Sequence, residues 1–382
     1  MAIDFTPSWT DSDLGTYRDT VVRYLETEML PRDRAARAQG HVGHDLWLKA
    51  GSLGLLCADI SSEYGGADGD FRHMAILYEE MARRGLTGMN AAVHSIVAHY
   101  LVNHGTQAQK QKYLPRLATG ELVGAIAMTE PGAGSDLQAI RTRAERREGG
   151  YVINGSKTFI SNGYLAGLVL VVAKTNPAER ARGISIFIVE TEGCAGYRVG
   201  PLLDKIGMKA QDTAELFFDN VSVSADCLLG GKEGEGFFQL MADLPYERAV
   251  IGVNAVATME GAYEATLAYV RERQAFGKPL AEFQNTKFKL AEIATDIKVA
   301  RVFIDHCVEA FVAGRLDTTT ASMAKLWGSE LQCKVIDECL QLFGGYGYMN
   351  EYLIGRMYVD SRVQRIYGGA NEVMKEVISR AL

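Results

Sequence analysis

The residues that decide the fold class are LVLVVAK (168–174) and GISIFIVE (183–190), two apolar runs separated by a polar, proline-containing stretch. Short runs rich in Val, Ile and Phe, bounded by Asn, Pro and Gly, are typical of strands joined by turns. Similar runs occur nearby, namely GAIAM (124–128), YVING (151–155) and AELFF (214–218). The chain from residue 122 to 235 therefore predicts a β module. Within it, Asn154-Gly155 predicts a two-residue hairpin turn, because both positions tolerate positive φ.

The segments on either side of this module follow a helical period. Apolar residues recur three and four positions apart between residues 11 and 117, and this period returns after Gly236. Four stretches predict the C-terminal helices, 237–273, 282–313, 318–343 and 353–379. The predicted class is α+β with three domains, a helical domain at 1–121, a β domain at 122–235 and a helical domain at 236–382. Such segregation argues against a doubly wound parallel sheet.

Composition narrows the functional classes. The chain has 382 residues, 47% of them hydrophobic and 23% charged, and its net charge of −7 argues against nucleic-acid binding. It has no G-x-G-x-x-G dinucleotide loop, no nucleoside-triphosphate loop and no cysteine spacing typical of a metal site. It also lacks a recognisable targeting signal and an apolar run of the roughly 20 residues that span a bilayer. We therefore expect a cytoplasmic protein with no metal and no integral membrane segment.

Two segments of the β module could contact a planar ligand. In TEPGAGSD (129–136), Gly132 and Gly134 leave backbone N–H groups free to face an electron-rich ring or a phosphate. The alternative is an ordinary Pro-Gly turn. In KTFISNG (157–163), an aromatic residue followed by hydroxyl and amide residues could line a cofactor. The alternative there is an edge strand with Phe159 in the core.

Two more candidate segments lie in the C-terminal helical region. RERQAFGKPLAEFQ (271–284) places Arg273, Phe276 and Gln284 around a Gly-Lys-Pro break, where a guanidinium could pair with phosphate and an aromatic could stack on a base. QLFGGYGYMNE (341–351) has three glycines that allow close backbone approach at a helix end. The alternatives are a solvated helix end for the first segment and a turn between helices for the second.

Two carboxylates compete for the role of a base. Glu247 lies in LPYERAVIG, before Arg248 and an apolar run, so it joins a helix whose other faces are apolar. Facing a dry cavity, its carboxyl would have a raised pKa and could accept a proton near neutrality. An exposed Glu-Arg pair at a helix start is the alternative. Glu372, in IYGGANEV, better fits a capping role.

Taken together and in this order, the segments resemble the acyl-CoA dehydrogenase family. TEPGAGSD is similar to the first signature of the family, and QLFGGYGYMNEY with RIYGGANEVMKEVISR resembles the second. EYGG (63–66) comes before the first signature, LGGKEGEGF and RQAFGKPLAEFQ fall between the two, and all three stand at the positions that the family has. The resemblance covers the chain from about residue 11 to its end and is greatest to the long-chain members.

The resemblance implies an N-terminal helical domain, a central β-barrel-like domain and a C-terminal four-helix bundle, with FAD between the last two and a homotetramer as the usual assembly. Residues that would surround the flavin ring are Met128, Thr129, Ser135, Phe159 and Ser161. Residues that would reach the ADP end, often that of a neighbouring subunit, are Arg273, Phe276, Gln284, Gln341 and Gly345, and Ala370 and Glu372 would also contact FAD. Residues that would contact the acyl-CoA are Ser135, Tyr246, Arg248, Tyr367 and Gly368.

The catalytic base needs a choice within the resemblance. Many family members place a Glu after the tyrosine that corresponds to Tyr367, but here Gly368 follows it. Long-chain and isovaleryl-type members have the base on a bundle helix before an Arg, which matches Glu247-Arg248. The resemblance therefore assigns the base to Glu247, with Arg248 holding the carboxylate in place. The missing side chain at Gly368 would leave room for this carboxylate.

The implied reaction is α,β-dehydrogenation of an acyl-CoA to the trans-2-enoyl-CoA, with hydride passing to flavin N5 and electrons to an electron-transferring flavoprotein. Three alternatives remain open within the same fold: a branched-chain dehydrogenase, an oxidase that returns electrons to oxygen, and a DNA-binding flavoprotein. The acidic composition argues against the last of these.

Overall fold

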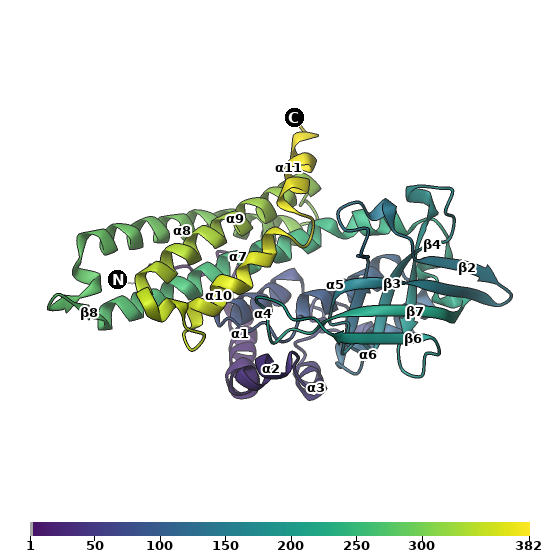
Figure 1. The fold of residues 1–382 in the computed structure, drawn as a ribbon, viewed down its shortest axis with the longest axis horizontal. Helices are drawn as coiled ribbons and strands as arrows, with labels where there is room; N and C mark the ends of the chain where they lie inside the picture. Colours follow the sequence, from purple (N-terminus) through teal and green to yellow (C-terminus); the bar gives the residue numbers. More distant parts are fainter. Residues whose placement is uncertain (1–2) are drawn as a thin grey trace.

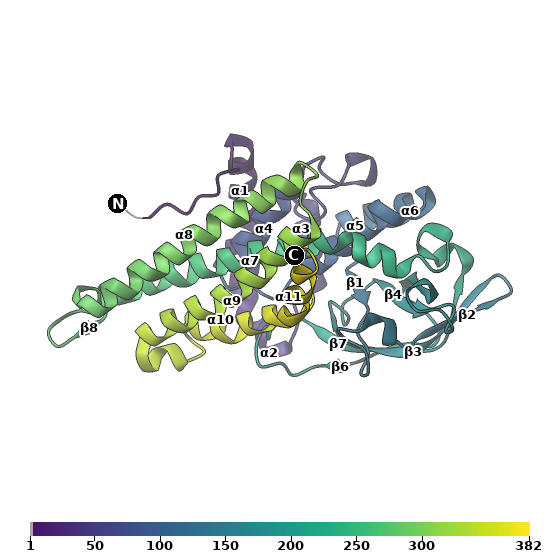
Figure 2. The ribbon, with the colours of Figure 1, turned by 90° about the horizontal axis from the view of Figure 1, so that it is seen from above.

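The computed structural model describes residues 3–382. Figures 1 and 2 show a long helical bundle that extends from one side of a curled sheet, with the N-terminal helices packed below their junction. The N-terminal helices are α1 (Ser12–Tyr24), α2 (Asp33–Gln39), α3 (His44–Ser52), α4 (Phe71–Arg83), α5 (Ala91–His104) and α6 (Gln107–Ala118). Asp11, Asp70, Asn90 and Thr106 cap four of them through side-chain oxygens, which accept from backbone N–H groups of the first turn.

The central sheet has the strand order β1-β4-β2-β3-β7-β6, with β5 paired to β4. Its strands are β1 (Gly124–Ala127), β2 (Arg143–Arg147), β3 (Gly150–Ser161), β4 (Leu168–Lys174), β5 (Ile184–Glu190), β6 (Tyr197–Leu202) and β7 (Thr213–Ser224). The two runs that predicted the module form β4 and β5, an antiparallel pair buried over most of its length. A strand that is buried on both faces has an almost continuous apolar sequence. This is why β4 and β5 could be recognised in the sequence.

The predicted turn at Asn154-Gly155 was wrong. Both residues lie inside β3, and the hairpin turn falls earlier, between Arg147 and Gly150. The β3–β7 register shifts between Ile153 and Gly155, and a Cβ on Gly155 would lie 2.4 Å from Thr142 Oγ1. This glycine therefore permits a bulge and a close approach rather than a chain reversal.

The C-terminal helices are α7 (Gly236–Glu272), α8 (Gln284–Val312), α9 (Thr318–Phe343), α10 (Leu353–Ser361) and α11 (Asn371–Ser379). A two-stranded ribbon, β8 (Gln274–Ala275) and β9 (Lys278–Pro279), joins α7 to α8. The predicted helix at 353–379 is thus two helices. They are separated by Gly368 and Gly369, whose φ angles of +62° and +89° break the helix. The predicted α+β class, with a sheet between two helical domains, is confirmed.

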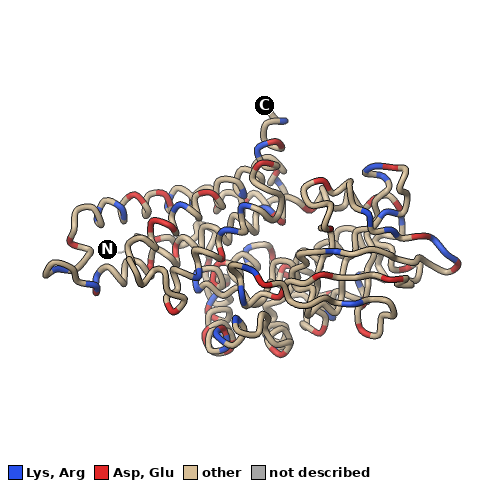
Figure 3. The backbone as a smooth tube through the Cα atoms, in the orientation of Figure 1, with Lys and Arg blue, Asp and Glu red and all other residues tan. Residues whose placement is uncertain are grey.

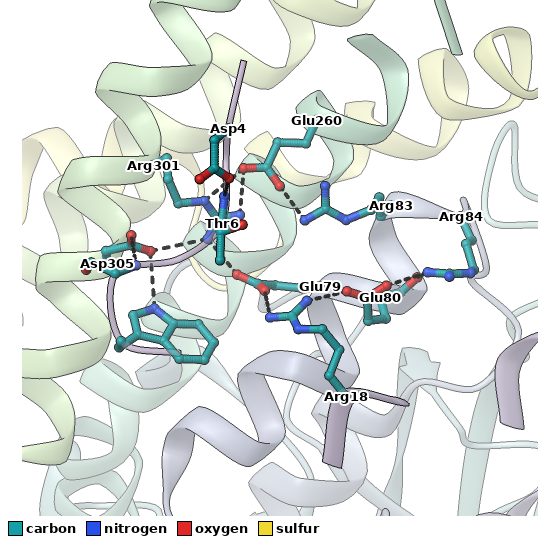
Figure 4. A network of polar contacts seen from close by, with 12 residues as sticks. Asp4, Thr6, Arg18, Glu79, Glu80, Arg83, Arg84, Glu260, Arg301 and Asp305 are labelled. Atoms are coloured by element: carbon teal, nitrogen blue, oxygen red, sulfur yellow. Dashed lines mark hydrogen bonds and ion pairs between the residues drawn. The ribbon is translucent and has the colours of Figure 1, made fainter. Parts of the chain in front are cut away.

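A buried ion-pair network joins the N-terminal helices to the bundle (Figure 4). Arg301 of α8 pairs with Glu79 of α4 and with Glu260 of α7, at 2.5 and 2.8 Å, and all three side chains are at most 1% exposed. Arg83 of α4 also pairs with Glu260, at 2.6 Å. Removing one member of such a pair leaves an uncompensated buried charge, so the network fixes α4 against α7.

The surface carries both signs of charge. Figure 3 shows Lys and Arg residues interspersed with Asp and Glu along the bundle and the sheet. Among residues 3–382, no helix combines the length and the apolar character needed to cross a bilayer.

Candidate active site

One cavity of about 720 Å³ lies where the sheet, the N-terminal helices and the bundle meet. Its walls come from α4 and α5, the loop after β1, the end of β3, one face of α7 and the segment between α10 and α11. Nine residues that the sequence proposed for the site line it, namely Met128, Thr129, Ser135, Phe159, Ser161, Glu247, Arg248, Tyr367 and Gly368. The fold therefore brings together two β-domain loops and two bundle segments that are far apart in sequence.

The first loop is held by a buried ion pair that sequence reasoning missed. Lys157 of β3 donates to the Met128 carbonyl at 3.0 Å and to the Glu130 carboxylate at 2.8 Å. That carboxylate also accepts from the backbone N–H groups of Arg141 and Thr142, at 2.6 and 3.0 Å. Burial lowers the pKa of Lys157 to about 8. These contacts fix the loop while Gly132 and Gly134 face open space.

The second loop presents an aromatic ring to the cavity. Phe159 has a φ of +59° and is 69% exposed, so it is not the core residue of an edge strand. This backbone region is costly for a bulky side chain, and such strain concentrates at functional sites. The Thr158 N–H donates to the Thr129 carbonyl at 2.9 Å, which ties the second loop to the first. Ser161 accepts from Gln211 Nε2 at 3.1 Å, and both residues line the cavity.

The Glu247 carboxylate faces the cavity from α7. Protein surrounds it, but its side chain keeps some exposure because the cavity opens in front of it. Burial raises the pKa of Glu247 to about 7, and Asp243, one turn earlier, adds to this shift by like-charge repulsion. Tyr100 of α5 donates to Glu247 Oε1 at 3.1 Å, and this bond acts in the opposite direction by stabilising the ionised form. The carboxylate can therefore accept a proton near neutral pH.

The residues of α5 that contact Glu247 and Asp243 were not predicted from the sequence. The Asp243 carboxylate accepts from Asn103 Nδ2 at 2.5 Å and lies 2.7 Å from His104 Nε2. Tyr100, Asn103 and His104 share one face of α5 by helical spacing, which could have suggested a polar patch on an otherwise apolar helix. Because Asp243 is held by partners of its own, the Glu247 carboxylate stays free toward the cavity.

Arg248 does not hold the Glu247 carboxylate as the resemblance implied. Its Nη1 donates to Ser322 Oγ of α9 at 2.8 Å, and within residues 3–382 Glu247 forms no ion pair. Burial lowers the pKa of Arg248. Because successive residues of a helix point about 100° apart, Arg248 faces α9 while Glu247 faces α5. Arg248 thus couples the first half of α7 to α9.

The space at Gly368 is filled by a side chain rather than left open. A Cβ at Gly368 would lie 2.4 Å from Ile251 Cδ1, and the positive φ is an added obstacle to other residues. The expectation of open room for a carboxylate is therefore corrected: Ile251 occupies it. The Gly368 N–H finds no hydrogen-bond acceptor among residues 3–382, so it is available to a ligand in the cavity.

A buried lysine clamps the glycine segment to α9. Lys325 is fully buried and donates to the Gly369 carbonyl and to Asn371 Oδ1, both at 2.6 Å. Asn371 in turn donates to Ser329 Oγ at 3.0 Å and to Glu330 Oε1 at 2.8 Å. Burial lowers the pKa of Lys325 to about 8. These bonds fix the peptide group that follows Gly369 and the side chain of Asn371.

Eight predicted site residues lie outside the cavity lining, and three of these are sequence neighbours of lining residues. Tyr246, expected to contact substrate, is 2% exposed, stacks on His99 at 4.1 Å and hydrogen-bonds Tyr78 at 3.2 Å. Its side chain belongs to the core, because Glu247 takes the cavity face of that helical turn. Ala370 is the N-cap residue of α11, and Glu372 is exposed in the first turn of that helix.

The remaining predicted cofactor residues lie at the far tip of the bundle. Gln284 begins α8, Gln341 is near the end of α9, and Arg273 follows α7 with its guanidinium 5.4 Å from the Tyr346 ring. Phe276 is 96% exposed, and a Cβ at Gly345 would meet nothing within 4 Å. Arg273 is 26 residues beyond Glu247, about 39 Å along the helix. One FAD molecule cannot reach both ends of α7.

The cavity fits the flavin half of FAD. Phe159 offers a ring face, Thr129, Ser135 and Ser161 offer hydroxyl groups, and Gly134 brings a backbone free of side chain to the same wall. Planar ligands are held in proteins by this combination of apolar walls and a few placed polar groups.

Three family models match almost the whole chain. They are the N-terminal, middle and C-terminal domains of acyl-CoA dehydrogenases, over residues 12–121, 125–221 and 234–382. The chain is 48% identical to the long-chain specific acyl-CoA dehydrogenase of Rattus norvegicus mitochondria over 374 residues, which is 97% of this chain and 86% of that protein. It is 36% identical to the isovaleryl-CoA dehydrogenase of Oryza sativa mitochondria, covering 97% and 91%.

Solved structures agree with these relatives. An acyl-CoA dehydrogenase from Geobacillus kaustophilus superposes with a TM-score of 0.95 at 42% identity, covering 98% of this chain and 99% of that one. A glutaryl-CoA dehydrogenase from Mycobacterium smegmatis, solved with FADH2, superposes with a TM-score of 0.90 at 28% identity, covering 97% and 95%. The predicted family and cofactor are thus confirmed, and the chain belongs to the FAD-dependent acyl-CoA dehydrogenase family of oxidoreductases.

Proposed function

We propose that the chain dehydrogenates long-chain acyl-CoA thioesters between the α and β carbons, with Glu247 as the base. The observation that carries the proposal is the placement of Glu247: it faces the cavity that the flavin-loop residues line, and its pKa is raised to about 7. No carboxylate stands at the alternative position, because residue 368 is a glycine packed against Ile251.

Several residues of the cavity have separate roles in proton removal. An α-proton of a thioester is too weakly acidic for an unaided carboxylate, so the charge that develops on the carbonyl oxygen must be met by fixed donors. The Gly368 N–H is such a donor, and Lys325 holds the same glycine segment in place through the Gly369 carbonyl. A preorganised donor of this kind contributes about 10²–10³ in rate. Tyr100 keeps the Glu247 carboxylate aimed at the cavity.

Met128, Thr129, Ser135, Phe159 and Ser161 would hold the flavin ring against this wall. FAD, when bound, supplies the acceptor for the hydride that leaves the β-carbon. By the resemblance, an electron-transferring flavoprotein then takes the electrons. A homotetramer in which the bundle tip of one copy contacts the FAD of another accounts for the five residues at the tip, which lie too far from Glu247 of their own chain: Arg273, Phe276, Gln284, Gln341 and Gly345.

The long-chain assignment rests on 48% identity to a long-chain enzyme against 36% to an isovaleryl-type enzyme. A branched-chain substrate is the second candidate, because the resemblance gives both classes a base before an Arg on the bundle helix.

The test is anaerobic bleaching of the bound flavin by acyl-CoA thioesters of graded length and branching. We expect rapid bleaching that is fastest with long straight chains, followed by slow reoxidation in air. Fastest bleaching by isovaleryl-CoA would replace the long-chain proposal, and rapid reoxidation in air would identify an oxidase. Absence of bleaching by every thioester would contradict the proposed function.

A further inference from the structure

The end of the cavity farthest from Glu247 along α7 carries a polar patch. It is lined by Asn254 and Thr258 of α7, Gln332 of α9, Ser361 at the end of α10 and Gln364 in the turn that follows. All except Asn254 are at most 8% exposed, and Gln332 is fully buried. Burying polar groups costs free energy unless they are hydrogen-bonded. We therefore expect the polar groups of this patch to have hydrogen-bond partners.

The register of α7 against α9 places these residues at one level. Arg248 of α7 bonds Ser322 in the second turn of α9, and Tyr269 stacks on Phe343 at 4.2 Å near the ends of both helices. Because both contacts are separated by the same number of residues on each helix, α7 and α9 run parallel and in step. Thr258 and Gln332 each lie ten residues beyond the first contact, so they occupy the same level of the bundle.

The distance from the reacting centre follows from helix geometry. Glu247, Asn254 and Thr258 share the cavity face of α7. At 1.5 Å per residue, Asn254 lies about 10 Å and Thr258 about 16 Å beyond Glu247. Val250 and Ile251 form an apolar section between them. An acyl chain leaving the thioester next to Glu247 would cross this section before it reached the polar end.

Several hydrogen-bonding groups at this end have no partner. Within residues 3–382, neither amide atom of Gln332 makes a hydrogen bond, and Gln364 Oε1 also makes none. The hydroxyls of Thr258 and Ser361 each donate to a carbonyl of their own helix at 2.7 Å, which leaves their oxygens able to accept. The patch therefore offers donors and acceptors together, as a hydroxyl group requires.

The charges around the patch favour a neutral group over an anion. Over residues 3–382, the cations that line the cavity are Arg248, which is bound to Ser322 at the Glu247 end, and Arg380 of the C-terminal segment. Asp360, next to Ser361, is the acidic residue of this part of the lining. A buried carboxylate at the chain end would lack a cation and would meet Asp360.

We propose that Asn254, Thr258, Gln332, Ser361 and Gln364 bind a neutral hydroxyl group near the far end of the acyl chain. The substrate class is then an acyl-CoA whose chain carries an alcohol about 10 to 16 Å beyond the thioester. This inference rests on the proposed function of the same cavity and adds a specificity determinant to it.

The experiment compares three series of acyl-CoA thioesters of graded length, with a methyl, hydroxyl or carboxyl group at the last carbon. We expect that at one chain length the hydroxylated substrate has a kcat/KM roughly threefold to tenfold above its methyl counterpart, as one or two net hydrogen bonds allow. The carboxylated substrate should be the poorest. In Gln332→Leu the ratio of hydroxyl to methyl should fall to one or below, and in Asp337→Asn, on the exposed face of α9, it should keep its wild-type value.

Gln332→Leu also has a stability readout. Replacing an unpartnered buried amide by an apolar side chain of similar size should leave the Tm of the FAD-loaded enzyme unchanged or higher. A large fall in Tm would mean that Gln332 has a structural partner, which contradicts the proposal. A methyl preference at every length, or a ratio that Gln332→Leu does not change, would also overturn it while leaving the proposed dehydrogenase intact. Failure of all three series to bleach the flavin would instead refute the proposed function.

Discussion

The two ends of α7 present the predicted FAD ligands in opposite ways. At the cavity end, Phe159, Ser161 and Glu247 converge from a sheet and a helix on one enclosed space. At the bundle tip, Arg273 and Phe276 lie three residues apart in sequence and face outward, and Phe276 is almost fully exposed. The cavity end is an enclosed site, whereas the groups at the bundle tip are exposed.

This difference separates chemistry from assembly. The cavity end has its own supports, such as the Lys157–Glu130 pair and the Lys325 clamp, which hold reacting groups in fixed geometry. The tip is incomplete in one chain because about 39 Å of helix separates it from Glu247 at the reacting end of the cavity. Variants at the cavity end should therefore change the chemical step, and variants at the tip should change FAD retention.

The largest expected effect comes from Glu247→Gln. Removing the base while keeping the shape should lower kcat by about 10²–10⁴, with FAD still bound at wild-type stoichiometry. Steady-state turnover of a long-chain acyl-CoA together with the flavin absorbance gives both quantities. Asp337→Asn on the bundle surface is the matched control. Equal losses of kcat in both variants would indicate a folding defect and not the loss of the base.

The second prediction concerns Gly368→Glu in the Glu247→Gln background. The new side chain would meet Ile251 at a position of positive φ, so it should restore no activity and should lower stability by about 1–3 kcal/mol. Adding Ile251→Ala should then recover part of the turnover. Measurements of activity and thermal unfolding on the double and triple variants test this prediction. Full restoration of activity by Gly368→Glu without Ile251→Ala would show that Ile251 moves to make room for the new side chain.

Lys325→Met should have a smaller effect, through position. Without the bonds to Gly369 and Asn371, the Gly368 N–H loses its fixed direction, and kcat should fall by roughly 10–100-fold, less than for loss of a complete donor. KM should change less than kcat. Lys325→Arg, which keeps a donor, should recover part of the loss, whereas equal activity of the two variants would argue against a positioning role.

At the tip, Arg273→Ala should weaken FAD affinity by about tenfold, as expected for loss of one charge-assisted bond. The effect should show in the FAD titration of the apoprotein more than in kcat of the saturated enzyme. An unchanged titration would show that the tip does not bind the cofactor. The main argument for FAD sites shared between copies would then fail.

The smallest change is expected for Tyr100→Phe. The lost hydroxyl stabilises the ionised carboxylate, so the pKa of Glu247 should rise above about 7. Activity requires the ionised base and falls as pH decreases through this pKa, so the acidic limb of the kcat/KM profile should move to higher pH. At neutral pH the loss should be less than tenfold. A shift toward lower pH would mean that Tyr100 does not donate to the base.

Sequence patterns predicted the features that depend on residues close together in the chain. The order of helices, sheet and helices follows from apolar periodicity. Glycine and aromatic placement made the two flavin loops candidates, and the resemblance to the family selected this interpretation over an ordinary turn and an edge strand. The patterns failed where tertiary packing decides. Asn154-Gly155 forms a bulge because β3 continues through it, and Tyr246 turns into the core because its neighbour faces the cavity.

The supports of the site could not be predicted for the same reason. Lys157 and Glu130 are 27 residues apart, and Lys325 and Gly369 are 44 residues apart. Each is an ordinary charged residue in its local context, so only the fold reveals its partner. The filled space at Gly368 was also hidden, because Ile251 has the same apolar character as its helical neighbours.

The most direct test of Glu247 as the base is loss of α-deuterium from an acyl-CoA analogue whose β-position cannot release hydride. The wild-type enzyme should exchange the α-deuterium with solvent, at a rate that rises with pH through about 7. Glu247→Gln should bind the analogue and exchange it at least about 100-fold more slowly. Exchange by Glu247→Gln at the wild-type rate would contradict the account, because another group would then remove the proton.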